Sequence, residues 1–265
     1  MGLEFKESPL EGVILPHQLE DEFLSLYDNG LQRGLKLGIG LDEIFTWKEG
    51  ELTVVTGIPG HGKSRFVEFV SLILAKKYGW DWAIYTPEHN PISRHMATLA
   101  NIYTGKSFFG FNKMSKIDAM NALDFIDEHY NYIGIHDKDV LNIDEIIEYT
   151  KGLVQTKGIK GLIIDTYTNI DPEIDGKIGQ TTVIQNHLNK FKILKNLGVH
   201  VIIVAHPQKM ENENNPPTPY RISGSAHWSN MPDNTMTVFQ GENEIGERQH
   251  TIYTWKVKKN EVARS

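Results

Sequence analysis

One stretch decides the fold, and it reads Leu52-Thr53-Val54-Val55-Thr56-Gly57-Ile58-Pro59-Gly60-His61-Gly62-Lys63-Ser64-Arg65. Its first five residues are apolar or β-branched, which predicts a buried strand. The next eight fit the pattern G-x-x-x-x-G-K-[ST] at every required position, and a helix is predicted to follow. Glycines let the backbone wrap an anion with its N–H groups pointing inward, and a helix N-terminus adds the positive end of a dipole. The stretch predicts a phosphate-binding loop made by Gly57, Pro59, Gly60, His61, Gly62, Lys63, Ser64 and Arg65.

Two side chains of this loop carry specific chemistry. Lys63 brings a mobile positive charge to the β- and γ-phosphates of a nucleoside triphosphate. The Ser64 hydroxyl is a suitable Mg²⁺ ligand, and a second ligand, Asp165, ends the apolar run Gly161-Leu162-Ile163-Ile164. We therefore predict that the chain binds ATP, or another nucleoside triphosphate, together with Mg²⁺ held by Ser64 and Asp165.

Hydrolysis also needs a group that orients or deprotonates water, and Glu88 is the candidate for this role. It follows the predicted strand 83–86, which we expect to lie next to the phosphate-loop strand with its carboxyl end at the nucleotide. His206 ends the predicted strand 199–205 and reaches the same edge, where it would contact the γ-phosphate. The predicted catalytic residues are Glu88, Lys63 and His206.

Apolar strands alternate with amphipathic helices along most of the chain. Strands that are joined by helices pair in parallel, with right-handed crossovers. Two last strands, 235–240 and 249–259, are joined by a hairpin at 241–248. The predicted fold is α/β: a mostly parallel twisted sheet flanked by helices, extended by a C-terminal β-hairpin. The other predicted strands are 52–56, 83–86, 132–136, 162–165 and 199–205, and the helices between them are 63–78, 91–103, 115–130, 143–156 and 181–197.

Size and composition bound the class of protein. With 265 residues, 40% of them apolar, the chain suits one large α/β domain. The absence of cysteine excludes disulfides and thiolate metal sites and suits a reducing cytoplasm. We see no apolar run near 18 residues and no apolar signal core, so we expect neither membrane association nor secretion. The net charge of −7 argues against a basic surface that coats duplex DNA.

The first 30 residues are predicted to be a leader and a linker helix, ahead of an ATPase domain at 31–265. Apolar residues at Leu19, Phe23 and Leu26 have helical spacing, and Gly30 is a suitable stop. Two interpretations remain open. The helix covers its own domain, or it is an arm that docks on a neighbouring subunit.

Two long loops stand out, at 166–180 and at 206–222. Loops of this length in a compact domain are usually functional or disordered. Both follow strands that end near the predicted nucleotide.

These segments together resemble the RecA-like P-loop ATPase domain of DnaB-like and Twinkle-like replicative helicases, especially the phage-type relatives. The resemblance extends from about Leu19 to the C-terminus. It is carried by residues 50–57, by Tyr85-Thr86-Pro87-Glu88 and by Asp165. More specific are Val204-Ala205-His206-Pro207-Gln208-Lys209-Met210, Ile222-Ser223-Gly224-Ser225-Ala226-His227-Trp228 and Pro232-Asp233-Asn234.

The resemblance implies a homohexameric ring that moves along single-stranded DNA in the cytoplasm of a bacterial or phage-infected cell. It implies Glu88 as the catalytic glutamate and His206 at the phosphate-sensing position. The loops after Asp165 and after His206 would face the central channel. Lys209 and Arg221 would then contact the DNA backbone.

The sequence departs from the family pattern near its C-terminus. The family places K-x-R on a late strand that reaches the neighbouring subunit's nucleotide, whereas this chain has Lys256-Val257-Lys258. Lysine lacks the planar fork that grips phosphate, so either Lys258 or Arg264 is the candidate trans finger. The primase-like domain of some relatives is not in this sequence, which predicts a separate primase or loader as a partner.

The predicted function is an ATP-dependent DNA helicase that forms a ring and translocates on single-stranded DNA. The first alternative is a RecA-fold ATPase that binds DNA or protein without unwinding. A second is a P-loop kinase acting on a small molecule, which usually needs an arginine-rich lid that we do not see.

Overall fold

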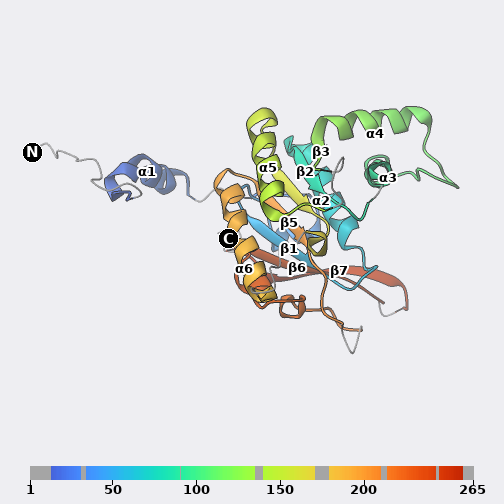
Figure 1. The fold of residues 1–265 in the computed structure, drawn as a ribbon. Coiled ribbons are helices and arrows are strands. Elements are labelled where there is room, and N and C mark those ends of the chain that lie inside the picture. The colour runs from blue at the N-terminus through green and yellow to red at the C-terminus, as the bar shows by residue number, and fades with distance from the viewer. Residues whose placement is uncertain are drawn as a thin grey trace, which may run out of the picture.

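The computed structural model describes residues 13–30, 34–89, 91–134, 140–170, 179–209, 214–242 and 245–258. Within this part of the chain, strands form one seven-stranded sheet in the order β3-β2-β4-β5-β1-β6-β7 (Figure 1). All neighbours pair in parallel except β6 and β7, which form the antiparallel hairpin predicted from the sequence. The strands are β1 (Leu52–Thr56), β2 (Trp82–Tyr85), β3 (Tyr130–Tyr132), β4 (Gly161–Ile164), β5 (His200–Val204), β6 (Asn234–Glu242) and β7 (Arg248–Lys256).

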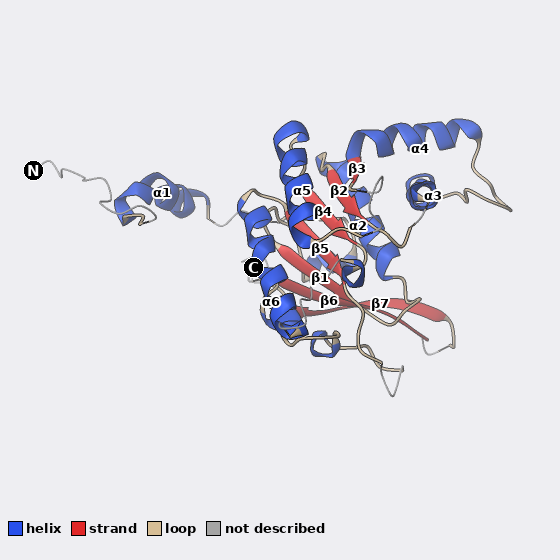
Figure 2. Cartoon of the chain, in the orientation of Figure 1, coloured by secondary structure: helices blue, strands red, loops and turns tan. Residues whose placement is uncertain are grey.

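Helices cover both faces of this sheet (Figure 2). Because side chains alternate across a strand, Val54 faces one core and Val55 the other. The first core is closed by α5 (Ile143–Lys157) and α6 (Gln180–Asn196). The second is closed by α2 (Lys63–Tyr78), α3 (Ile92–Thr104) and α4 (Lys116–His129). The structure therefore has the architecture that the sequence predicts, a mostly parallel sheet flanked by helices on both faces.

One expectation about the sheet is wrong. The strand carrying Glu88 was expected next to the phosphate-loop strand, but β4 and β5 lie between β2 and β1. Both neighbours of β1 are instead supplied by later parts of the chain, β5 and β6. β1 and β2 are consecutive in the sequence but are not neighbours here, because the chain leaves β1 for β2 and β3 and only later fills the space between β1 and β2 with β4 and β5.

Smaller differences concern the ends of elements. Pro91 is the N-cap residue of α3, in an extended conformation, and not part of its first turn. The third strand is β3, two residues earlier than predicted, and residues 135–136 of the predicted range lie outside the described residues. β6 is longer than predicted at both ends. None of these shifts moves a predicted site residue to another edge of the sheet.

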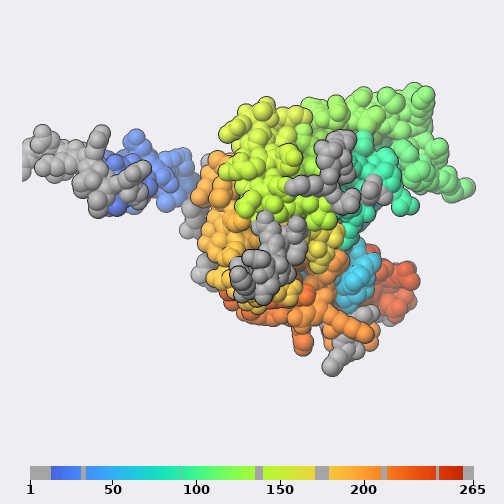
Figure 3. All heavy atoms as spheres, in the orientation of Figure 1, coloured from blue at the N-terminus to red at the C-terminus, as the bar shows by residue number. Residues whose placement is uncertain are grey.

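The N-terminal segment stands apart from the sheet (Figures 1 and 3). A short 3-10 turn at Pro16–Leu19 leads into α1 (Glu20–Asn29), and no residue of either element is buried. In this structure α1 therefore does not cover its own domain, which was one of the two interpretations of this helix. Among the described residues, no helix combines the length and apolar character needed to cross a membrane.

Candidate nucleotide-binding site

The phosphate loop lies between β1 and α2, where the sequence predicts it. Gly57 has a φ of 151°, and a side chain there would collide with the Val238 carbonyl oxygen of β6. Gly62 is the N-cap of α2 in a left-handed conformation, with φ of 86°. Since L side chains rarely adopt these conformations, both positions require glycine. The N-terminus of α2 thereby opens directly onto the loop, as an anion site needs.

Lys63 is the first residue of α2 and points back into the loop. Its Nζ donates to the carbonyl oxygens of Gly57, at 2.9 Å, and Ile58, at 3.1 Å. Burial lowers the pKa of the ammonium, while the nearby carboxylates of Asp165 and Glu88 raise it. Within the described residues, the hydrogen bonds of this buried cation go to carbonyl oxygens of its own loop, which places it well for a phosphate.

Asp165 follows β4 and is 5% exposed. One oxygen, Oδ1, is buried with no hydrogen-bond partner among the described residues. Burial raises the pKa of this carboxyl, and a hydrogen bond from the Ser64 side chain lowers it. A buried carboxylate with a free oxygen beside a serine hydroxyl fits a hard divalent cation such as Mg²⁺, which takes oxygen ligands. The residues present therefore fit the metal that the sequence predicts.

Glu88 reaches the same edge although β2 is not next to β1. A turn follows β2, in which His89 N donates to Thr86 O at 3.2 Å, and it leaves the Glu88 side chain exposed. The Thr166 hydroxyl, next to Asp165, donates to Glu88 Oε1 at 3.0 Å. Because β4 lies beside β2, the end of β4 holds Glu88 close to Asp165. Thr166 was not identified from the sequence.

His206 comes two residues after β5 and completes this edge. Its Nδ1 is buried without a partner among the described residues. Burial lowers the pKa of the imidazole and Lys63 lowers it further, whereas Glu88 and Asp165 raise it. These influences show that all four ionisable groups lie near one another. The structure thus brings together Lys63, Asp165, Glu88 and His206, from four different segments.

Two predicted loop contacts have other partners. His61 Nδ1 accepts a hydrogen bond from Gln240 N at 3.0 Å, and its ring packs against Phe239 on β6. The Arg65 guanidinium donates to Thr98 O on α3 at 3.0 Å. Both side chains attach the phosphate loop to neighbouring elements. Pro59 and Gly60 lie exposed at the tip of the loop.

The predicted DNA contacts lie at the base of one loop. Gln208 N donates to Arg221 O at 2.7 Å, and Pro207 pairs with Ile222, so the two ends of the segment are joined. Lys209 and Arg221 are both exposed there. The segment is anchored by Trp228, which is fully buried and donates to Ser223 O. Ser223 and Trp228 of the motif at 222–228 therefore have a structural role, which is to anchor this segment.

The trans-finger candidates lie elsewhere. Lys258 follows β7, is exposed, and pairs with Asp233 at 3.3 Å. Its backbone N–H donates to Asn234 Oδ1, at the start of β6. Lys258 is therefore at the amino-terminal edge of the parallel strands, opposite the phosphate loop. Arg264 lies outside the described residues.

Comparisons with known proteins agree with this geometry. The chain is 30% identical over 253 residues to the chloroplastic/mitochondrial Twinkle homolog protein of Arabidopsis thaliana, a match that covers 91% of this chain and 36% of that protein. The chain thus spans little more than a third of that relative's length. Among solved structures, the ATPase domain of G40P superposes with a TM-score of 0.72 at 14% identity, over 91% of each chain. No protein-family model matches the sequence.

The sheet order, the phosphate loop and the acid that ends β4 define a RecA-like P-loop fold. More particularly, the similarity to the Twinkle homolog and to the ATPase domain of G40P supports a RecA-fold domain of the DnaB-like and Twinkle-like type, as the sequence motifs predict.

Proposed function

We propose that this chain is the ATPase domain of a ring-forming DNA helicase that moves along single-stranded DNA. The observation that carries the proposal is the convergence of Lys63, Asp165, Glu88 and His206 at one edge, beside two long loops. In this proposal ATP is hydrolysed next to the start of the two loops that bind single-stranded DNA.

Each residue of the edge has a distinct role in this proposal. Lys63 exchanges its two loop carbonyls for the β- and γ-phosphates of ATP. Ser64 and Asp165 hold Mg²⁺, which when bound neutralises charge on the phosphate oxygens. Glu88, held by Thr166, orients water and accepts its proton. His206 contacts the γ-phosphate and transmits its loss to the loop that carries Lys209 and Arg221.

The position of Lys258 supports a site that is completed between subunits. Asp233 N donates to Leu52 O, so Lys258, paired with Asp233 and Asn234, lies level with the start of β1. Five residues of strand separate that level from Gly57, a distance of roughly 17 Å at about 3.3 Å per residue. This exceeds the reach of a lysine side chain, so Lys258 does not reach the nucleotide of its own chain, and in our proposal it acts on that of an adjacent copy.

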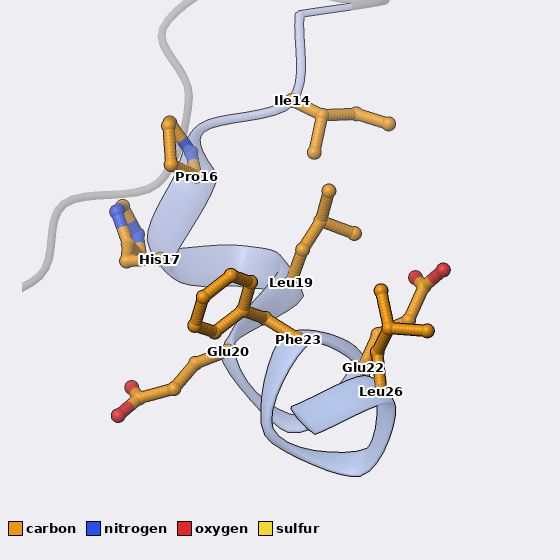
Figure 4. A pocket seen from close by; sticks show the side chains of 8 residues that line it. All are labelled: Ile14, Pro16, His17, Leu19, Glu20, Glu22, Phe23 and Leu26. Carbon is orange, nitrogen blue, oxygen red and sulfur yellow. The ribbon is translucent and has the colours of Figure 1, made fainter. Parts of the chain in front are cut away.

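The arm, residues 1–30, supports the same assembly. Ile14, Leu19, Phe23 and Leu26 line an open apolar pocket that belongs to the arm alone (Figure 4). Phe23 is 67% exposed and Tyr27 is 81% exposed. Apolar residues left this open on a helix are typical of an interaction surface. In our proposal this surface docks on a neighbouring subunit of a homohexamer.

A strand-displacement assay tests the proposed function. The wild-type chain, ATP and Mg²⁺ are incubated with a forked DNA duplex that has one labelled strand, and Lys63→Ala is the control. We expect ATP-dependent release of the label by the wild type only. Turnover stimulated by single-stranded DNA without any release would instead favour a RecA-fold ATPase that does not unwind.

A further inference from the structure

A buried polar network lies behind the phosphate loop, outside the residues discussed so far. Glu68 sits one helical turn beyond Ser64 on α2, and its side chain is 5% exposed. Its Oε1 lies 3.3 Å from His95 Nε2, in the first turn of α3. The other imidazole nitrogen, His95 Nδ1, lies 2.8 Å from the Tyr132 hydroxyl at the end of β3. The network therefore ties three elements together: α2, α3 and β3.

This network continues towards Glu88. The ring of His95 packs on the ring of His89, with centroids 5.2 Å apart. His89 closes the turn that begins at Thr86 and is the neighbour of Glu88 in the chain. Glu88 is thus held from two sides, by the Thr166 hydroxyl and, through His89, by the Glu68–His95–Tyr132 network.

The protonation of the network is consistent with a fixed geometry. Burial raises the pKa of Glu68 to about 8, with Arg65 opposing and Asp165 adding to the shift. Burial also lowers the pKa of His95 to about 3, and His89 adds to that shift. Burial thus favours the neutral form of both groups. With both groups neutral, the Glu68 carboxyl is the donor available to His95 Nε2 across the 3.3 Å contact, and His95 Nδ1–H then donates to the Tyr132 oxygen.

We propose that Glu68, His95 and Tyr132 are positioning residues that set the location of Glu88 over the phosphate loop. The proposal rests on the proposed ATPase function and on Glu88 as its base. Its physical basis is that small displacements of a catalytic group, of about 1 Å, reduce rates by roughly 10²-fold. The network gives the turn at 86–89 a rigid support from the same helix that presents the phosphate loop.

The chain offers a matched pair of variants for the test. Tyr132 and Tyr130 lie two residues apart on β3, and each gives its hydroxyl one hydrogen-bond partner, His95 and Ser71 respectively. Tyr132→Phe and Tyr130→Phe each remove one such bond. We expect Tyr132→Phe to lower kcat for ATP about tenfold with unchanged nucleotide affinity, and Tyr130→Phe to leave both constants near wild type.

Variants of Glu68 give a second measurement. Glu68→Leu deletes the donor and should lower kcat by a similar factor, whereas Glu68→Gln keeps an N–H donor to His95 and should retain most of the rate. In a Glu88→Gln background, whose own rate falls by about 10², neither Tyr132→Phe nor Glu68→Leu should reduce turnover further. This non-additivity is what a purely structural role would not produce.

The outcomes separate the inference from the function it rests on. Equal rates for Tyr132→Phe and Tyr130→Phe, or full additivity with Glu88→Gln, would overturn the positioning role while the ATPase stands. A wild-type chain without ATP turnover would overturn the proposed function and this inference together.

Discussion

The two edges of the parallel sheet differ in whether their buried ionisable groups have hydrogen-bond or ion-pair partners. At the carboxyl-terminal edge, Asp165 and His206 each keep a buried atom without a partner among the described residues. At the amino-terminal edge, every ionisable group that we compare is paired. Asp233 accepts from Leu52 N at 2.8 Å and also contacts Lys195 and Lys258, and Glu51 accepts from Asn234 at 2.8 Å.

His200 and His206 show this difference most directly, because they lie at opposite ends of the β5 segment. His200 begins β5, is fully buried, and uses both ring nitrogens, towards Thr53 and the Lys48 carbonyl. His206 follows the same strand, and its Nδ1 has no partner within the part of the chain that the structure describes. Unpaired buried polar atoms cost stability, so ionisable groups that keep such atoms at one strand edge are candidates for binding a ligand. The difference indicates that the carboxyl-terminal edge is organised for ligands and the opposite edge for the fold.

The largest effect is expected at the carboxyl-terminal edge. Lys63→Ala deletes the charge nearest the β- and γ-phosphates, and loss of one such group typically costs about 10²–10³ in rate. Steady-state ATPase and binding of a fluorescent ATP analogue measure the change. Near-wild-type turnover in this variant would show that the carboxyl-terminal edge does not bind the phosphates through Lys63.

Lys258 lies at the amino-terminal edge, and in our proposal it contributes to catalysis only in an assembly, at the nucleotide of the neighbouring subunit. Trans fingers contribute about 10³–10⁵ in rate. We expect Lys63→Ala and Lys258→Ala chains to be inactive alone and to recover part of the ATPase activity when mixed, because some interfaces then have both groups intact.

Lys160 provides the control for that mixing experiment. It is partly exposed and is also ion-paired at the amino-terminal edge, with Glu49 at 3.0 Å. Lys160→Ala should keep full activity unmixed. No recovery in the Lys63→Ala and Lys258→Ala mixture, despite proven subunit exchange, would argue for a site completed within one chain. Recovery only when Arg264→Ala takes the place of Lys258→Ala would assign the role to Arg264.

Substitutions at the two edges should change the free energy of unfolding in opposite directions. Asp233→Asn breaks two ion pairs and should lower the free energy of unfolding by about 2 kcal/mol, with nucleotide affinity unchanged. Asp165→Asn should remove Mg²⁺-dependent nucleotide binding yet raise the free energy of unfolding of the free chain, by about 1 kcal/mol, since a buried carboxylate with one oxygen unpartnered among the described residues is costly. Urea titrations at pH 7 measure both. Equal destabilisation by the two variants would contradict the contrast.

The pH dependence of the Asp233 effect has a defined sign. Burial alone would raise the pKa of this carboxyl, but Lys195, the Leu52 N–H and Lys258 outweigh it and lower the pKa below 3.8. A lowered folded-state pKa contributes stability that is present above 3.8 and is lost as pH falls through the folded-state value. The wild type and Asp233→Asn should therefore converge in stability at acidic pH.

Local patterns in the sequence predicted most of this edge. The phosphate loop, Asp165, Glu88 and His206 each sit at a strand end, and strand ends are readable from apolar runs and glycines. The order of β2, β4 and β5 was not readable, because it depends on pairing between distant segments. For the same reason the Glu68–His95 contact and the attachment of His61 to β6 were missed: each joins side chains from different elements.

The smallest effect is expected in the loop that follows His206. Lys209→Ala and Arg221→Ala should each weaken binding of single-stranded DNA and lower the slope of log affinity against log salt by about 0.7, leaving basal ATPase nearly intact. Fluorescence anisotropy of a labelled oligonucleotide at several salt concentrations measures the slope. Loss of basal activity with unchanged DNA affinity would place these residues in the nucleotide site.

The most direct test of the account is the ATPase rate of the wild-type chain with Mg²⁺, measured with and without single-stranded DNA. We predict a basal rate that Lys63→Ala abolishes and that single-stranded DNA increases, because the DNA-binding loops start at the edge that hydrolyses ATP. A measurable rate that does not change with DNA would contradict the proposed coupling of hydrolysis to DNA binding. A chain that hydrolyses no ATP in either condition would contradict the proposed ATPase function itself.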